Sequence, residues 1–349
     1  MSSNKTEFFT ACVTFDFMIQ SVGMGILIVF GFTGNILSMI CLNRDRSKTA
    51  TPFLLISLEV ADTFFLGFAV LLRVVPSTAI YILYPGEAPS SLNTLLSFCG
   101  AYVYPLALVS ETTTIYLTLL VTVNRYVSVC KPYEVSRIRS VTHARRYVCL
   151  IVLLSFAINL PRFFEYDYIS TENSTRSART SMADNHVYKI VYANSIYCLV
   201  MFLVPLTTLI ILNHRLIRAL REARRKRAQL LNSDTSRSED DITLVLIVVV
   251  LVFVVCQTPA LATQILHSFL EDEQKECPMP YYFYERLSDF MVVVNSSLNF
   301  TIYCFCSKRF RQILKNLICK VNSEIPMTEI TQLDTKIDNG TQTGRKSQM

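Results

Sequence analysis

One stretch of the chain decides its fold: residues 101–126, which read AYVYPLALVSETTTIYLTLLVTVNRY. The stretch contains a single charged residue, Glu111, before it ends in Asn124, Arg125 and Tyr126. A helix needs about 20 apolar residues to cross the ~30 Å hydrocarbon core of a membrane, and this stretch is long enough. An arginine is costly inside that core and easily solvated at its edge, so Arg125 indicates where the span ends. It is either an anchor that fixes topology or part of a switch that faces a cytoplasmic partner.

Apolar segments of similar length recur along the chain. With 51% hydrophobic and 17% charged residues and a mean hydropathy of +0.37, the sequence is more apolar than is usual for a soluble protein. The net charge of +6 does not indicate a nucleic-acid-binding face, because the basic residues cluster between the apolar segments. The predicted membrane spans, of which the fourth is the shortest, are 17–42, 51–72, 97–123, 147–164, 190–213, 242–269 and 283–306.

Lysine and arginine indicate the orientation. The gaps after the first, third, fifth and seventh segments are much richer in these residues than the N-terminus and the other gaps. Since basic loops stay in the cytoplasm, we predict a plasma-membrane protein with its N-terminus outside and its C-terminus inside. The basic run 214–227 is expected to extend the fifth helix into the cytosol, as a solvated anchor or a docking surface. Glycosylation sequons at Asn4 and Asn173 fall outside, whereas the sequon at Asn339 falls inside and is disregarded.

The predicted fold class is an all-α membrane protein: a seven-transmembrane helix bundle with a short C-terminal amphipathic helix. Its parts are an extracellular N-terminus (1–16), the bundle (17–306), the amphipathic helix on the membrane surface (307–320) and a disordered cytoplasmic tail (321–349). Cys319 is a candidate for palmitoylation. Candidate phosphorylation sites in the tail are Thr328, Thr331, Thr341, Thr343 and Ser347.

Carboxylates occur within or at the edge of the apolar segments, at Glu59, Asp62, Glu111 and Asp289. Ionisable groups at membrane depth are costly and are therefore functional candidates. Asp62 is accompanied by the amides of Asn35, Asn295 and Asn299, the last two of which share a helix face. Such a cluster can bind a small cation such as Na⁺ or change protonation between states. A static polar network that holds the helices together would select the same residues.

Several positions taken in order resemble the signature of the rhodopsin-like G-protein-coupled receptors: Asn35, Asp62, Arg125, Pro205, Pro259, Asn299 and Tyr303. The resemblance covers about residues 20–320. It narrows to the invertebrate FMRFamide-type neuropeptide receptors, including the nematode branch, through LPRFFEY at 160–166, CQTPA at 256–260 and NSSLNFTIYC at 295–304. In the last two stretches, Gln257 and Phe300 stand where the family usually has Trp and Pro.

The resemblance implies a receptor, not an enzyme, that passes the signal of an extracellular peptide to a heterotrimeric G protein. A receptor kinase and arrestin would then act at the tail, and membrane lipids would surround the bundle. The cytoplasmic switch would comprise Asn124, Arg125, Tyr126, Asn299 and Tyr303. No cofactor is expected apart from an allosteric Na⁺ ion, which would be held by Asp62, Thr114, Asn295 and Asn299. Gln257 would occupy the toggle position beneath the ligand.

The chain departs from the family at its switch and in its disulfide. Asn124 replaces the usual aspartate, so a neighbouring acid no longer restrains Arg125; basal activity would rise unless the restraint comes from elsewhere. The usual bond to the second outer loop cannot form, because Pro161 to Lys189 contains no cysteine. Cys99 and Cys277 are the first candidates. Cys12–Cys277, Cys99–Cys277, Cys12–Cys99 and no bridge all stay open, with a bond that involves Cys277 favoured.

The ligand site is predicted at the outer side of the bundle. The acidic run 271–276 attracts a cationic ligand, although a solvated loop can be acidic without binding one. A peptide that ends in Arg-Phe-amide would offer a guanidinium to a carboxylate, either Glu111 or Asp289, and a ring to an aromatic wall. The predicted ligand-binding residues are Glu111, Asp289, Gln257, Gln264, Tyr104 and Glu165.

Other classes of membrane protein fit the sequence less well. A receptor for another peptide or for a small molecule fits the same motifs, but the seventh segment has no lysine for the Schiff base of an opsin. The outer half of the third segment has no aspartate for an amine. A multi-pass transporter or channel would favour repeats and glycine-rich broken helices, whereas the chain has only nine glycines and no repeat. A membrane enzyme is disfavoured because the four histidines lack metal-ligand spacing.

Overall fold

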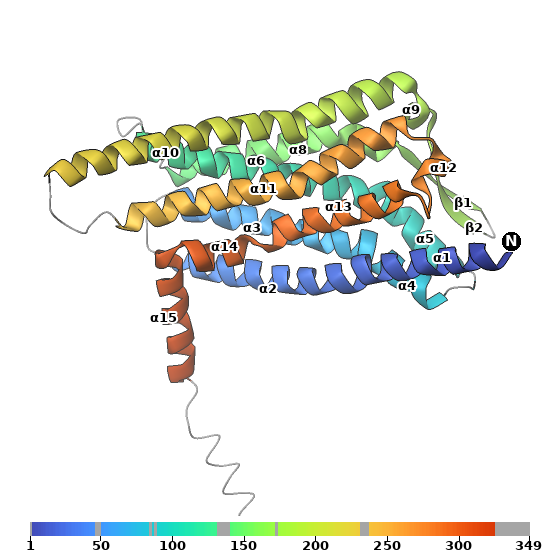
Figure 1. Ribbon diagram of the computed structural model, residues 1–349, viewed down its shortest axis with the longest axis horizontal. Helices are drawn as coiled ribbons and strands as arrows, with labels where there is room; N and C mark the ends of the chain where they lie inside the picture. Colours follow the sequence, from blue (N-terminus) through green and yellow to red (C-terminus); the bar gives the residue numbers. More distant parts are fainter. Residues whose placement is uncertain are drawn as a thin grey trace, which may run out of the picture.

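The structure is a computed structural model that describes residues 2–45, 50–83, 86, 89–130, 140–171, 174–230 and 237–324. Long helices run side by side in a bundle, and a shorter helix, α15 (Lys308–Glu324), is set across one end of it (Figure 1). The N-terminus and a two-stranded sheet lie at the opposite end (Figure 1). Helices satisfy their own backbone hydrogen bonds, which a chain must do inside a hydrocarbon layer.

Helices occupy each of the predicted spans in the described part of the chain. Five helical segments are long and apolar enough to cross a membrane on their own: Phe9–Asn43, Ala50–Leu83, Ser90–Ser128, Val141–Phe164 and Tyr188–Ala219. Helices α13 (Pro280–Ser297) and α14 (Asn299–Cys306) meet at a bend of 48° and pass the same test as a pair. Helix α11 (Arg237–Phe269) contains a shorter apolar stretch, Leu251–His267. The fourth span was predicted to begin at residue 147, but its helix begins at Val141, so the span is longer than predicted.

Most spans combine α-helix with wider, π-helical turns. The first span contains α1 (Ser2–Asp16), η1 (Phe17–Gly23) and α2 (Met24–Asn43), and the second contains α3 (Ala50–Ala69), η2 (Val70–Val74) and α4 (Val75–Leu83). The third contains α5 (Ser90–Phe98), η3 (Cys99–Val103) and α6 (Tyr104–Cys130). The fourth contains α8 (Val141–Asn159) and the 3-10 turn η4 (Leu160–Phe164), and the fifth contains η5 (Tyr188–Ile196), η6 (Leu199–Leu203) and α10 (Val204–Leu230).

The start of α1 and the end of α10 can be compared with the boundaries predicted from the sequence. The N-terminal segment expected outside the bundle up to residue 16 is helical from Ser2 and continues into the first span without a break. Helix α10 continues to Leu230, as predicted for the basic run 214–227.

Proline explains three of the π-helical turns. Pro76, Pro105 and Pro205 are each the second residue of the α-helix that follows η2, η3 and η6, respectively. Because proline donates no backbone hydrogen bond and its ring collides with the carbonyl four residues back, a wider turn relieves the clash. Pro259, by contrast, lies inside α11. The three turns adjoin residues that line the cavity described below.

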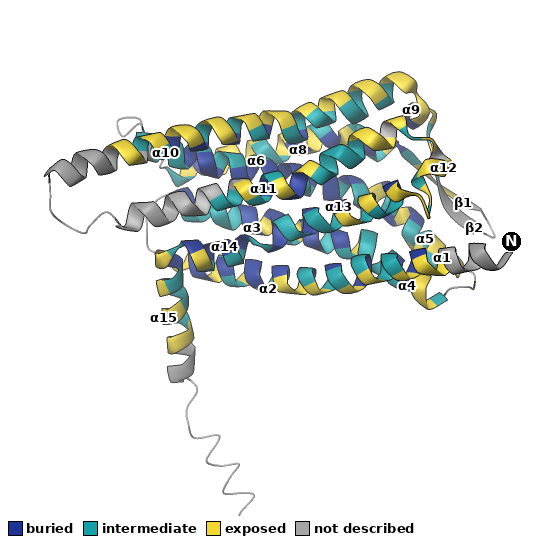
Figure 2. Cartoon of the chain, in the orientation of Figure 1, coloured by how far each residue is buried: buried dark blue, intermediate teal, exposed yellow. Residues whose placement is uncertain are grey.

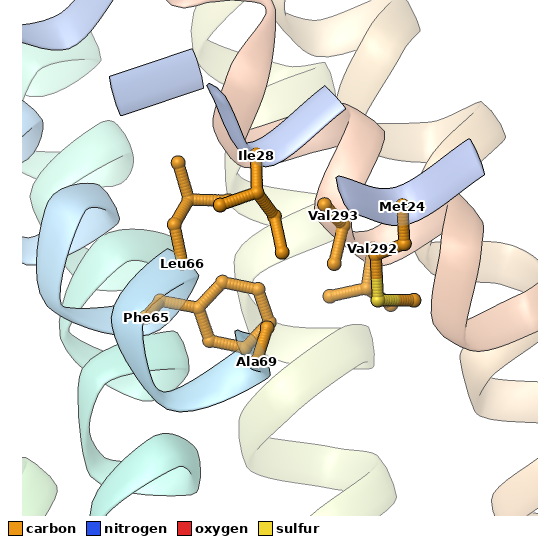
Figure 3. Packing of buried hydrophobic residues seen from close by; sticks show 7 residues of the cluster. All are labelled: Met24, Ile28, Phe65, Leu66, Ala69, Val292 and Val293. Carbon is orange, nitrogen blue, oxygen red and sulfur yellow. The ribbon is translucent and has the colours of Figure 1, made fainter. Parts of the chain in front are cut away.

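The helices pack through apolar side chains on their inner faces and leave their outer faces exposed (Figure 2). One buried cluster joins α2, α3 and α13 through Met24, Ile28, Phe65, Leu66, Ala69, Val292 and Val293 (Figure 3). Glycine allows α2 to approach its neighbours closely. A Cβ atom at Gly31 would lie 2.6 Å from Ser297 Oγ, and one at Gly34 would lie 2.8 Å from Phe300 Cβ.

A hairpin and a disulfide shape the outer end. Strands β1 (Tyr166–Thr171) and β2 (Ser174–Arg179) pair antiparallel in the second outer loop, where no strand was predicted. The disulfide joins Cys12 of α1 to Cys277, just before α13. It therefore involves Cys277, as favoured, whereas the other first candidate, Cys99, is a buried free thiol in η3. The reason is that α1 extends far enough outward to bring Cys12 beside Cys277. Asn4 lies in α1, and Asn173 falls outside the described residues.

The predicted amphipathic helix is α15, which packs against the inner end of the bundle. Its buried Phe310 contacts the cluster of Cys41, Leu42 and Tyr303. Arg309 pairs with Asp45, which fastens α15 to the end of the first span. Cys319 is exposed on α15. The candidate phosphorylation sites lie in 325–349, outside the described residues.

Candidate functional site

A cavity of about 240 Å³ lies among the outer parts of the helices. Its walls come from the second, third, fifth, sixth and seventh spans, with Met24 of α2 at one side. A space of this size admits a small molecule or the end of a peptide, but not a folded protein. Most of the predicted ligand-binding residues line it, namely Glu111, Asp289, Gln257, Gln264 and Tyr104.

The two carboxylates predicted to bind a ligand cation have different surroundings. Asp289 Oδ2 of α13 lies 2.9 Å from Arg73 Nη2 of η2, and both side chains are partly buried. This internal ion pair already compensates the charge of Asp289. Glu111 of α6 forms no ion pair with any residue that the structure describes, and its carboxyl faces its hydrogen-bond partner, the Gln257 amide of α11. Of the three carboxylates that line the cavity, Asp289 and Glu285 are therefore paired with arginines, whereas Glu111 has no described basic partner.

Polar side chains also tie the cavity walls to one another. Gln264 Nε2 donates to the Ala193 carbonyl oxygen at 2.8 Å, which joins α11 to η5. His267 Nδ1 lies 3.2 Å from the Tyr281 hydroxyl, which joins α11 to α13 near the cavity mouth. These contacts hold the sixth helix in register with both of its neighbours.

Glu165 was predicted at the ligand site, but the structure places it outside the cavity. Glu165 is buried at the end of the fourth span, where its Oε1 accepts hydrogen bonds from Arg162 Nη1 at 2.7 Å and from the Tyr188 hydroxyl at 2.8 Å. The charge of Glu165 is thus compensated by Arg162, three residues earlier, and the Glu165 carboxylate is little exposed to solvent. The sequence analysis judged this acid by its loop position and did not consider its pairing with Arg162.

Arg162 is the centre of an aromatic cluster that was not predicted. Its guanidinium lies over the rings of Tyr192 and Tyr197 of the fifth span, at 5.4 Å and 5.2 Å from the ring centroids. Tyr197 also lines the cavity, so the cluster supports one cavity wall. The stretch LPRFFEY carried the signal: an arginine and a glutamate three residues apart at a helix end can form an ion pair.

The cluster also secures the hairpin. Thr180, which follows β2, donates from its hydroxyl to the Phe164 carbonyl oxygen at 2.8 Å. Its backbone N–H donates to the Glu165 carbonyl oxygen at 3.0 Å. The two ends of the hairpin are thereby held together at the end of the fourth span, in a loop without a cysteine.

A polar core surrounds Asp62 in the middle of the bundle. Asn299 Nδ2 donates to Asp62 Oδ2 at 2.6 Å, and the hydroxyls of Thr114 and Ser296 face the same carboxylate. Three of the four residues predicted to hold Na⁺ are therefore together. Asn295 is not among the described partners of Asp62, and Ser296 takes its place. The Na⁺ set was taken from the family resemblance; the helix face that Asn295 and Asn299 were expected to share is interrupted by the bend between α13 and α14.

The predicted cytoplasmic switch lies at the inner ends of α6 and α14. Asn124 is buried, and its Nδ2 donates to Thr51 Oγ1 of α3 at 3.1 Å. Arg125 and Tyr126 follow in the last turns of α6 and are partly exposed. Tyr303 of α14 is buried, with its ring centroid 5.6 Å from that of Phe310 in α15.

Comparison with known proteins agrees with the resemblance that the sequence motifs indicated. The model of the family described as "7 transmembrane receptor (rhodopsin family)" matches residues 34–303. The chain is 28% identical to the FMRFamide receptor of Drosophila melanogaster, over 97% of this chain and 59% of that receptor. It is 27% identical to the FMRFamide peptide receptor frpr-18 of Caenorhabditis elegans (86% and 70% covered) and 27% identical to the Sex peptide receptor of Drosophila melanogaster (84% and 71%).

These matches confirm the predicted fold class and the predicted resemblance, and they do not support a transporter. The chain nevertheless spans only about three fifths of the length of the Drosophila FMRFamide receptor (59%). The family model covers most of the chain, from the first span to Tyr303 in the seventh. The chain therefore belongs to the rhodopsin family of seven-transmembrane receptors.

Proposed function

We propose that the chain is a cell-surface receptor for an extracellular neuropeptide that ends in Arg-Phe-amide, and that it signals through a heterotrimeric G protein. Two relatives that are named as FMRFamide receptors support this class of ligand. The basic inner loops and the outer sequon at Asn4 support an extracellular N-terminus in the plasma membrane. Receptor kinase and arrestin would act on the serines and threonines of the tail, and lipid would cover the exposed apolar faces.

The observation that carries the proposal is the contrast between Glu111 and Asp289. Because Arg73 already neutralises Asp289, Glu111 is the carboxylate that gains most from a ligand guanidinium. The rings of Tyr104 and Tyr197 line the same cavity and can pack against the ligand phenylalanine. The amides of Gln257 and Gln264 can donate to and accept from the amidated end of the peptide, which carries no charge.

The same proposal assigns the inner end of the bundle to the G protein. Arg125 and Tyr126 lie at the end of α6, beside the basic extension of α10. Asn299 connects Asp62 of the polar core to the helix that carries Tyr303. A shift of α14 when the ligand binds would therefore move Tyr303 relative to Arg125, and Arg125 would then reach the G protein.

The experiment that tests the proposal compares two glutamates that line the cavity. Receptor variants Glu111→Gln and Glu285→Gln are expressed at matched surface density, and second-messenger responses to Arg-Phe-amide peptides are recorded. Loss of a buried partner for the ligand guanidinium should lower potency on the order of 30-fold or more in Glu111→Gln. Glu285, whose carboxylate lies 3.6 Å from Arg286 Nη1, serves as the control and should change potency by less than about threefold.

A second peptide ligand tests whether the Glu111 carboxylate pairs with the guanidinium of the peptide. A peptide with citrulline in place of arginine has nearly the same shape but no charge. It should lose potency on the wild-type receptor and lose little more on Glu111→Gln, because both changes remove the same interaction. Equal losses from the citrulline peptide on both receptors would reject Glu111 as the partner of the arginine. Silence of the surface-expressed wild type toward all Arg-Phe-amide peptides would reject this ligand class.

A further inference from the structure

The polar core lies directly inward of the cavity. On three helices the innermost residues that line the cavity are Phe65, Glu111 and Val293. Three residues further in on the same helices, just under one turn or about 4.5 Å deeper, are the core residues Asp62, Thr114 and Ser296. The cavity and the polar core are therefore separated by less than one helical turn along each of these helices.

A second carboxylate lies one more turn inward. Glu59 precedes Asp62 by three residues on α3, so the two side chains occupy one face of the helix, and the Tyr303 hydroxyl of α14 faces Glu59. Both acids are fully buried, at 0% exposure. Neither forms an ion pair with a described lysine, arginine or histidine. Two acids are thus placed side by side at membrane depth without a cation to compensate them.

Oxygen atoms in this core lack hydrogen-bond partners of good geometry within the described part of the chain. No well-formed hydrogen bond reaches either carboxylate oxygen of Glu59, Asp62 Oδ1 or Thr114 Oγ1, although the Tyr303 hydroxyl faces Glu59 and the Thr114 hydroxyl faces Asp62. The neighbouring first helix adds Asn35 Oδ1 and Ser38 Oγ. Buried polar atoms are nearly always satisfied, so a group of unsatisfied oxygens indicates a ligand that accepts lone pairs. A cation is such a ligand, and it would also compensate the two negative charges.

The donor atoms determine which cation fits. All of them are carboxylate, hydroxyl or amide oxygens, and among the described residues no three His, Cys, Asp or Glu side chains are placed to hold a metal ion together. The usual ligand sets of zinc or iron are therefore not met. Two carboxylates match the charge of a divalent ion. An irregular shell of protein oxygens suits Ca²⁺, because Mg²⁺ demands near-ideal octahedral geometry and keeps most of its water.

We propose that Glu59 and Asp62 together form a Ca²⁺ site, with Thr114 and the amide oxygen of Asn35 as further donors. The Na⁺ site expected from the family resemblance does not include Glu59, and a single carboxylate there suits a monovalent ion. The additional acid changes the charge of the site and thereby its preferred ion. The site would be filled from the extracellular side through the ligand cavity. It rests on the fold alone and does not depend on which peptide the receptor binds.

The test measures thermal unfolding of the purified full-length receptor without any peptide. The midpoint Tm is followed as CaCl₂, MgCl₂ or NaCl is added at constant ionic strength, balanced with choline chloride. Wild-type Tm should rise with Ca²⁺ at sub-saturating Na⁺, by on the order of 2–4 °C for each tenfold increase above the Kd. Glu59→Gln should lose the Ca²⁺-dependent shift and keep a response to Na⁺, whereas Asp62→Asn should lose both. Glu273→Gln, which removes an exposed acid of the outer loop, should behave as the wild type.

A direct measurement of Ca²⁺ binding tests the proposal even if the Glu59→Gln or Asp62→Asn variant does not fold. Equilibrium binding of radioactive Ca²⁺ to the wild-type receptor should saturate near one ion per chain, and a large excess of Na⁺ should compete with it. Three results would overturn the proposal: no Ca²⁺ binding by the folded wild type, stabilisation by Na⁺ alone, or an unchanged Ca²⁺ shift in Glu59→Gln. A Tm that follows pH but no cation would also overturn it, by showing that Glu59 is instead satisfied by a proton.

Discussion

Asn124 has a side-chain amide at the position where rhodopsin-like receptors usually have the carboxylate of an aspartate. The structure shows what this amide contacts. Its Nδ2 donates to Thr51 Oγ1 at 3.1 Å, so the side chain is held by the second span instead of by its neighbour Arg125. The side chain is buried, which makes this contact specific. A neutral hydrogen bond between helices therefore contributes to the restraint on the inner end of α6.

The variant Asn124→Asp should lower signalling in the absence of ligand. A carboxylate beside Arg125 adds an ion pair of about 1 kcal/mol to the resting state, which corresponds to about a fivefold smaller active population. Basal second-messenger output at matched surface expression measures the effect. Thr51→Val, which removes the same hydrogen bond without adding a charge, is the control and should not reduce basal output. Equal basal signalling in the wild type and Asn124→Asp would show that an acid at this position does not restrain the switch.

At the scale of elements, the hairpin β1–β2 and the fifth helix share one anchor, the buried pair of Arg162 and Glu165. The side chains are only 7% and 9% exposed, so solvent screens their interaction little. Tyr188 and Tyr192 of the fifth span complete the anchor through the hydroxyl bond to Glu165 and the ring beneath Arg162. The second outer loop is therefore attached by packing, an ion pair and hydrogen bonds, where the family usually has a disulfide bond.

Glu165→Gln should therefore destabilise the receptor by about 3 kcal/mol, because it leaves the buried Arg162 without a counter-charge. Thermal unfolding of the purified protein measures the change. Asp184→Asn is the matched control: its carboxylate lies 3.5 Å from Lys189 and 3.7 Å from Arg179, but it is 58% exposed. The control should cost less than about 0.5 kcal/mol. Similar losses of Tm in the two variants would contradict the assignment of the anchor.

Helix α2 offers a second comparison, between two of its glycines. Gly34→Ala should destabilise the bundle by roughly 1–3 kcal/mol, because the new Cβ would lie 2.8 Å from Phe300 Cβ of α14 and the helices would have to separate. Gly25→Ala meets no atom within 4 Å and should be neutral, or stabilising by up to about 1 kcal/mol, because alanine is the better helix former. The difference in Tm between the two variants measures the close approach. Tolerance of alanine at both positions would show that α2 can shift without cost.

For the molecule as a whole, the sequence predicted what depends on local chemistry. The spans and their order follow from the length of hydrocarbon that each helix must cross, and the sixth and seventh segments were placed within a few residues of α11, α13 and α14. The amphipathic spacing of Phe310, Ile313 and Leu314 likewise predicted α15. Glu111 and Asp289 were predicted at the ligand cavity because ionisable groups are rare in apolar segments, whereas Gln257 was placed there through the family resemblance.

The misses concern contacts between residues far apart in the chain or across a bend. Cys12 and Cys277 are separated by 265 positions, and no local pattern selects Cys12 over Cys99. The pairing of Asp289 with Arg73 depends on how two helices face each other. The four-residue spacing of Asn295 and Asn299 was misleading because the helix bends between them. Tertiary geometry decided each of these cases.

The disulfide has a consequence for how the bundle can deform. The bond from Cys12 to Cys277 closes the first six spans into one covalent ring, and the seventh span leaves that ring as a tail. The outer end of α13 is thus pinned beside the first helix, whereas the inner end of α14 is joined covalently only to α15 and the C-terminal tail. A segment held at one end moves most at the other. The seventh span can therefore act as a lever whose pivot is at the disulfide and whose opposite end carries Tyr303.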